Sequence, residues 1–279
     1  MVVQHNLQAM NSNRMLGVTT QSQAKSTEKL SSGYKINRAA DDAAGLAISE
    51  KMRRQIRGLT QASANAEDGI SCVQTAEGAL NEVHDMLQRI NQLAVKGENG
   101  TLTSVDRGYI KSEVSQLMSE IDRVQSTTTF NEQNLLDGTF TGKGLQVGAE
   151  AGQHIDISIK NMNVSTLFSE DTATVGKFRD TSEVSSADFA SLNAVTKTAL
   201  AAVSQQRSDL GAVQNRLEHT INNLDNVVEN TTAAESAIRD TDMATEMVKY
   251  ANNNILAQAG QAMLAQANQA NQGVLSLLG

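Results

Sequence analysis

Residues 59–94 read LTQASANAEDGISCVQTAEGALNEVHDMLQRINQLA, and apolar positions recur in this stretch with a period of seven. A companion position follows three residues after each main position, and five consecutive heptads are typical of coiled-coil packing. The spacing predicts one long helix from about Leu46 to Lys96. Its seam is Leu59, Ala66, Val73, Leu80, Leu87 and Ala94, with companions Ala62, Gly69, Ala76, Val83 and Ile90.

Two further stretches are predicted to pack against this helix. One begins near Thr103, where Asp106 is spaced for a capping box, and the short preceding loop makes it an antiparallel neighbour. The other carries heptads again. Its seam is Phe189, Thr196, Val203, Leu210, Leu217, Leu224, Thr231 and Ile238.

The middle of the chain has a different pattern. Leu145–Val147 and Ile155–Ile159 alternate in polarity and are separated by glycines, which predicts a β-hairpin near residues 140–160. Residues 161–186 are rich in Ser, Thr and Asp with weak periodicity, which predicts a short surface loop.

The C-terminal stretch Tyr250–Gly279 contains no Asp, Glu, Lys or Arg. A charge-free helix costs little to desolvate, so we expect this tail to be buried among identical tails. Residues 3–32, which end at the stop signal Gly33, carry few charges and are the predicted partner of the tail. The expected assembly residues are Leu7, Met10, Leu256, Met263, Val274 and Leu277, on stripes that also include Ala267 and Ala270.

These elements predict a mainly α fold with two domains. Residues 1–42 and 243–279 would pair into a terminal helical domain, and residues 43–242 would form a coiled-coil domain with the hairpin. The tail holds too few large apolar residues to offset the entropy of ordering it. We therefore expect both chain ends to be disordered in the monomer and to fold on assembly.

Composition excludes several function classes. A formal charge of −8 argues against nucleic-acid binding, and no apolar run is long enough to span a membrane. The single cysteine, Cys72, cannot build a disulfide framework. No cleavable secretory signal is visible at the N-terminus.

No set of residues indicates catalysis, a metal or a cofactor. The four histidines are far apart, and His84 lacks a second histidine one turn away. Asp41 and Asp42 precede an Ala-rich run, so capping is favoured over an acid pair. Cys72 is favoured as a buried small hydrophobe over a reactive thiol. The basic residues Lys51, Arg53, Arg54 and Arg57 are equally consistent with a solvated flank and with a contact to an acidic face of another copy.

Motifs at both ends resemble the bacterial flagellins. The N-terminal ones are Asn6–Ala9, Leu30–Asn37 and Asp41–Ile48; the C-terminal ones are Ile238–Ala244, Leu264–Gln269 and Val274–Leu278. The resemblance implies a subunit of the flagellar filament, with the terminal domain in the filament core. Because large outer domains are replaced by about 25 residues, a smooth, thin filament is expected.

The resemblance also implies partners. They are further copies of the chain, a dedicated export chaperone, the filament cap and the hook–filament junction proteins. Export would be through the flagellar channel to an extracellular filament, without a cleavable signal. The chaperone would hold the C-terminal region, including Met243, Leu256, Leu264, Leu275 and Leu278.

Flagellins are also detected by a Toll-like receptor through a motif similar to Leu87–Val95. Its expected contacts are Gln88, Arg89 and Leu93, together with Glu113 from the next helix. Leu87, Ile90 and Ala94 are seam positions, which leaves Arg89 and Leu93 to face outward.

Two readings compete with a filament subunit. A hook–filament junction protein shares the terminal helices but does not polymerise. A secreted receptor ligand or adhesin acting as a monomer would keep its function without the last thirty residues.

Overall fold

The computed structural model describes residues 6–168, 172–180 and 183–276. Contacts divide the chain into two units. We call Met1–Ile56 with Glu229–Gly279 the terminal unit, and Arg57–Val228 the central unit. The division falls within two long helices, α2 (Ala43–Glu98) and α6 (Ser186–Arg239). It comes after the boundary expected near residue 42 and before the one expected near residue 242.

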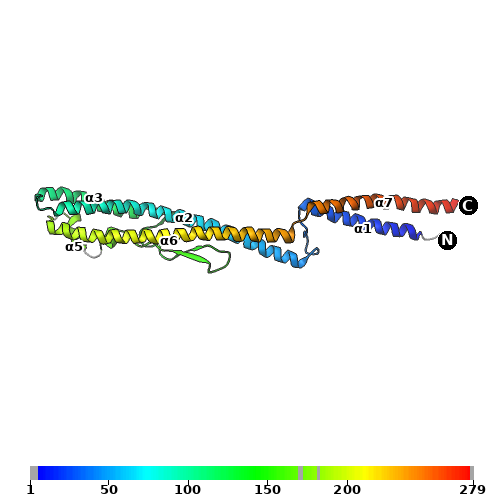
Figure 1. Cartoon of the computed structure of the whole chain (residues 1–279), viewed down its shortest axis with the longest axis horizontal. Coiled ribbons are helices and arrows are strands. Elements are labelled where there is room, and N and C mark those ends of the chain that lie inside the picture. Colours follow the sequence, from blue (N-terminus) through cyan, green and yellow to red (C-terminus); the bar gives the residue numbers. More distant parts are fainter. Residues whose placement is uncertain (1–5, 169–171, 181–182, 277–279) are drawn as a thin grey trace. The chain divides into compact units, whose positions relative to one another are not determined.

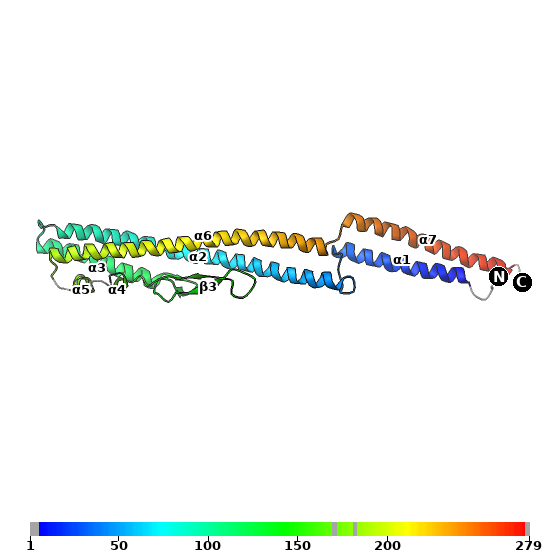
Figure 2. The ribbon, with the colours of Figure 1, turned by 60° about the horizontal axis from the view of Figure 1, so that its bottom comes forward.

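Three long helices run side by side in the central unit: α2, α3 (Ser104–Thr127) and α6 (Figure 1; Figure 2). Every seam and companion position predicted on α2 is buried. On α6 the buried seam extends from Phe189 to Leu224, and beyond it Thr231 and Ile238 are only half-buried. The predicted mainly α fold with coiled-coil packing is confirmed.

The turn between α2 and α3 follows its sequence signals. Thr103 and Asp106 form a reciprocal capping box: the Thr103 side chain accepts from the Asp106 N–H, and the Asp106 carboxylate accepts from the Thr103 N–H. Gly97 is the second-to-last residue of α2, and the ring of Phe189 lies close to it. A Cβ at Gly97 would lie 2.5 Å from Phe189 Cδ1, so the close approach requires glycine.

The predicted hairpin is present. Strand β3 (Lys143–Gln146) pairs antiparallel with β4 (His154–Ile157), with Leu145 opposite Ile155. Ile155 and Ile157 are buried, as period-two alternation requires. A second, shorter hairpin was not predicted. It joins β1 (Thr129–Phe130) to β2 (Gln133–Asn134), and its turn residues Asn131 and Glu132 both have positive φ.

The surface loop predicted for residues 161–186 is wrong in its described part. This stretch contains α4 (Val164–Leu167) and α5 (Thr172–Arg179), and Phe168 and Phe178 are fully buried. Phe178 packs edge-on against Phe189, with ring centroids 5.0 Å apart. Together with the buried side chains of Met162, Val164, Leu167 and Val175, the two phenylalanines supply the apolar area that folds the described part of the segment onto the helices.

The terminal unit contains α1 (Leu7–Ser32) and α7 (Met243–Ser276), which lie antiparallel, so that α1 begins where α7 ends (Figure 1). Gly33 ends α1 with φ 77°, the left-handed cap that the sequence predicts. Asp242 accepts from the N–H groups of Ala244 and Thr245 at the start of α7. An isolated antiparallel β-bridge pairs Tyr34 with Asp240. It joins the chain just after α1 to the chain just before α7.

Candidate assembly surface

The contact between α1 and α7 is a heptad seam built from small and polar residues. Shielded positions recur on both helices at alternating steps of three and four. On α1 they are Ala9, Ser12, Leu16, Thr19, Gln23, Ser26 and Leu30; on α7 they are Glu246, Tyr250, Asn253, Ala257, Gly260, Leu264 and Ala267. The predicted partnership of the two chain ends is confirmed. Large side chains occupy a minority of the seam positions, namely Leu16, Leu30, Tyr250 and Leu264.

Polar contacts supplement this weak apolar seam. Asn253 Nδ2 donates to the Ser22 hydroxyl at 3.1 Å, and Asn6 Nδ2 donates to the Ala267 carbonyl at 3.1 Å. Near the base of the pair Glu246 is buried, and so is Ser26. Burial alone would raise the pKa of Glu246, but its hydrogen bonds with Ser26 and Lys249 outweigh that effect and lower the pKa.

The large side chains of the apolar stripe predicted on α7 do not face α1, although Ala267 of that stripe occupies the seam. Leu256 and Met263 lie one residue before the seam positions Ala257 and Leu264, and are 57% and 55% exposed. One residue is about 100° around a helix, which moves these side chains from the seam to its flank. On α1 the predicted assembly residues Leu7 and Met10 are exposed too, at 68% and 65%.

A groove follows the flank of the pair. It has a volume of about 380 Å³. Its walls come from both helices, and Met15 on α1 and Leu256 and Met263 on α7 are its large apolar members. The other lining residues are Asn11, Ser12, Leu16, Thr19, Ala259 and Gly260.

The remaining predicted residues of the tail fall in two groups. Met243 is exposed, whereas Leu264 occupies the seam. The backbone of Val274 and Leu275 belongs to α7, but their side chains lie outside the described part of the structure, as do Leu277 and Leu278 altogether. The structure therefore brings together Leu256 and Met263 with a residue that the sequence did not single out, Met15.

The predicted receptor contacts lie on the central unit. Arg89 on α2 meets Glu113 on α3, with its Nη2 and Nε atoms 2.7 Å and 2.8 Å from Glu113 Oε1. Gln88 is exposed beside them and is 2.8 Å from a ring nitrogen of His84. The outward orientation predicted for Leu93 is wrong: it is 3% exposed and packs in the core of the central unit. It follows the companion Ile90 by three residues, close enough to the buried face to be enclosed.

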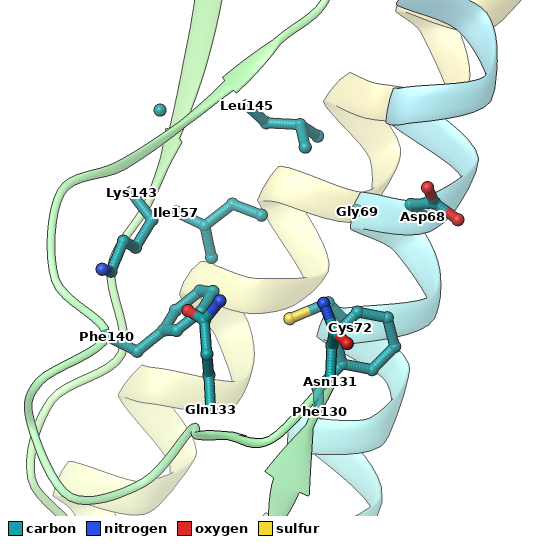
Figure 3. Close-up of a pocket in the computed structure, with 11 residues that line it drawn as sticks. Asp68, Gly69, Cys72, Phe130, Asn131, Gln133, Phe140, Lys143, Leu145 and Ile157 are labelled. Carbon is teal, nitrogen blue, oxygen red and sulfur yellow. The ribbon is translucent and has the colours of Figure 1, made fainter.

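A pocket of about 270 Å³ lies between α2 and the two hairpins (Figure 3). Phe130, Phe140, Leu145 and Ile157 make it largely apolar. Cys72 points into it from α2 but is only 4% exposed, and burial raises the pKa of its thiol (Figure 3). The reading of Cys72 as a buried hydrophobe is confirmed, since the thiolate needed for reactivity is disfavoured.

Other candidates have structural roles. Asp42 accepts from the Gly45 N–H at the start of α2, while Asp41 accepts from the N–H groups of Asn37 and Arg38. These hydrogen bonds lower the pKa of Asp41. Within the described ranges no three His, Cys, Asp or Glu side chains gather as a metal site would need. No helix in those ranges is long and apolar enough to cross a bilayer.

Comparison with known proteins identifies the family to which the chain belongs. Residues 3–141 match the bacterial flagellin N-terminal helical region, and residues 193–278 match the bacterial flagellin C-terminal helical region. The chain belongs to the bacterial flagellin family. Flagellins of that family are structural proteins, so the chain is not an enzyme.

Relatives that align over their whole length support the same family assignment. The chain is 53% identical over 278 residues to a flagellin of Halalkalibacterium halodurans and 49% identical over 303 residues to a flagellin of Bacillus subtilis, covering all of each chain. A putative flagellar hook-associated protein from Vibrio parahaemolyticus has a similar fold. Its TM-score is 0.60 and its identity 14%, over 72% of this chain and all of that one.

Proposed function

We propose that this flagellin assembles with copies of itself into the bacterial flagellar filament used for motility, with the terminal units packed in the filament core. The observation that carries the proposal is the terminal unit itself. Its two helices join mainly through small and polar residues and leave ten large apolar side chains exposed: Leu7, Met10, Met15, Val18, Met243, Met247, Val248, Ile255, Leu256 and Met263. Such a surface marks a protein–protein interaction site.

The charge distribution supports the same function. From Tyr250 onward the chain has no charged residue, so the outer face of α7 can enter a crowded core without burying an unpaired charge. The filament would lie outside the cell, and the export chaperone would bind the tail before α7 pairs with α1. Leu264, a proposed chaperone contact, is shielded once that pairing forms.

The alternative is a hook–filament junction protein, which shares the terminal helices. Electron microscopy of the purified full chain in precipitating salt distinguishes the two functions. A filament subunit forms long tubes, whereas a junction protein forms none. Cap and junction proteins are proposed partners at the two ends of those tubes.

A second proposed function is recognition by the flagellin-sensing Toll-like receptor. The observation that favours it is the exposed Arg89–Glu113 pair, which presents a charged, hydrogen-bonding surface across two helices with Gln88 beside it. A reporter-cell assay with the monomeric protein tests this function. Leu93 does not contribute a surface contact, because it is buried.

A further inference from the structure

We propose that the groove between α1 and α7 receives the outer edge of α1, formed by Leu7 and Met10, from a second copy of this chain. This inference rests on the proposed self-assembly and specifies which two surfaces meet in it. Both surfaces belong to the terminal unit, and both are exposed in the single chain.

The groove suits an uncharged occupant. None of its lining residues carries a charge, and Met15, Leu256 and Met263 are all more than half exposed. Gly260 lets the two helices approach, since a Cβ there would lie only 3.3 Å from Leu16 Cδ1. A charged side chain entering this groove would lose hydration without gaining a partner, whereas an apolar helix edge would bury its own surface and that of the methionines.

The edge formed by Leu7 and Met10 has matching properties. The two side chains are three residues apart, so they lie next to each other along the helix. They alternate with Ala9 and Ser12, which face α7, and so they lie away from the seam. Segment 7–13 contains no charged residue. The nearest charge on the same face is Arg14, one turn beyond Met10, and its guanidinium donates to Asn11 Oδ1 at 3.2 Å.

The relation between the two surfaces determines the type of assembly. The groove and the Leu7–Met10 edge are different parts of one unit, so each copy can receive one neighbour and insert into another. Such a heterologous contact repeats without closing when its rotation does not complete a ring, and it then generates an open helical filament. A self-complementary contact would stop at a dimer.

Charge substitutions test the contact in the full chain, with salt-induced polymerisation measured by sedimentation and electron microscopy. Met10→Lys places a charge on the edge, and Met263→Glu places the opposite charge in the groove. We expect each to raise the critical concentration for polymerisation at least tenfold. The double variant should recover most of the loss, because the two new charges meet in the contact. Both side chains are exposed, so circular dichroism should show an unchanged monomer.

Matched controls place the same charges on the same helices outside the two surfaces. Gln21→Lys and Gln261→Glu occupy exposed positions beyond the groove and the edge, and each should change the critical concentration less than threefold. The proposal is overturned if Met10→Lys polymerises like the wild type, or if the double variant is no better than the worse single variant. An Ile255→Lys variant that blocks assembly while Met10→Lys does not would assign the edge to α7 instead, and also overturns it.

Failure of the wild type to polymerise would refute self-assembly as well as this contact. Normal wild-type tubes combined with an absence of charge effects would refute the contact alone.

Discussion

The guanidinium of Arg89 and the carboxylate of Glu113 lie 2.7 Å apart, and this ion pair links α2 to α3 on the surface of the central unit. Both side chains are about half exposed. An exposed pair of this kind contributes only about 0–1 kcal/mol to stability, so its removal leaves the fold intact. The pair can therefore be tested as a recognition surface.

Arg89→Ala should reduce receptor activation about tenfold or more, because arginines at the centre of an interface often carry much of its affinity. The melting temperature should change little. Arg123→Ala is the matched control, since Arg123 forms a similarly exposed pair with Glu120 on α3. Equal receptor responses for the two variants would contradict the proposed recognition site.

Leu93→Ala should behave in the opposite way. Leu93 is buried, so the substitution should lower the free energy of unfolding by about 2–5 kcal/mol through lost packing. Chemical denaturation measures this loss. A Leu93→Ala variant with wild-type stability would show that the side chain is outside the core.

Two glycines of α2 should respond differently to the same substitution. Gly97→Ala forces a methyl group against the Phe189 ring and should cost about 1–3 kcal/mol. Gly78→Ala meets open space within the same helix and should stabilise it by about 0.5–1 kcal/mol. Thermal unfolding of the two variants provides the comparison, and a stabilised Gly97→Ala would refute the close ring contact.

Acid should destabilise the pairing of α1 and α7 near the start of α7. The pKa of Glu246 is lowered in the folded chain, so its contribution is present above its unfolded pKa of about 4.5 and is lost as pH falls through the lower folded value. Hydrogen bonds with Thr245 and Ala244 also lower the pKa of Asp242 from its usual value of 3.8. The stability that Asp242 contributes is therefore likewise present above that value and lost as the pH falls through the lower folded value.

Amide hydrogen exchange of the terminal unit, measured at pH 6 and pH 3.5, checks this prediction. The wild type should exchange faster at the lower pH after correction for intrinsic rates. Glu246→Gln should show a smaller difference between the two conditions, and an equal difference would contradict the role of Glu246.

The monomer should lose its two ends first during limited proteolysis. On α1 only Ser26 is buried among the described side chains, and on α7 only Glu246, Ala257 and Ala267 are. This seam buries far less apolar surface than the central unit, so we expect the ends to open often. Mass spectrometry of the fragments should show early cuts on both sides of a resistant central core, and a uniformly resistant full-length monomer would refute the expectation.

Periodicity predicted the long helices because their seams carry large apolar residues at fixed steps. Leu80, Leu87 and Leu210 are buried at the positions that the heptads indicate. Local signals predicted the ends of these helices equally well, since the capping box at Thr103 and the left-handed Gly33 depend only on nearby atoms.

The sequence was a poorer guide where tertiary contacts dominate. Leu167, Phe168, Val175 and Phe178 are buried but irregularly spaced among polar residues, so no period reveals that α4 and α5 fold onto the long helices. The first hairpin was missed because its turn, Asn131–Glu132, lacks the glycine that usually marks positive φ. Leu93 shows that one residue beside a seam can still be enclosed by a third helix.

The seam in the terminal unit determined which part of the tail could be predicted. Its pairing with α1 was expected, and its large apolar stripe was expected to be buried among identical tails. Small residues such as Ala257 and Gly260 give no apolar period, although they allow the closest helix approach. Sequence periodicity therefore marked the flank that the pair leaves exposed.

The weak seam between α1 and α7 also couples folding to growth of the polymer. Leu256 and Met263 lie beside this seam, and Met15 of α1 completes the groove that they line. A copy whose chain ends are open has no such groove until α1 has paired with α7. Each arriving copy must therefore complete its own terminal unit as it joins the polymer.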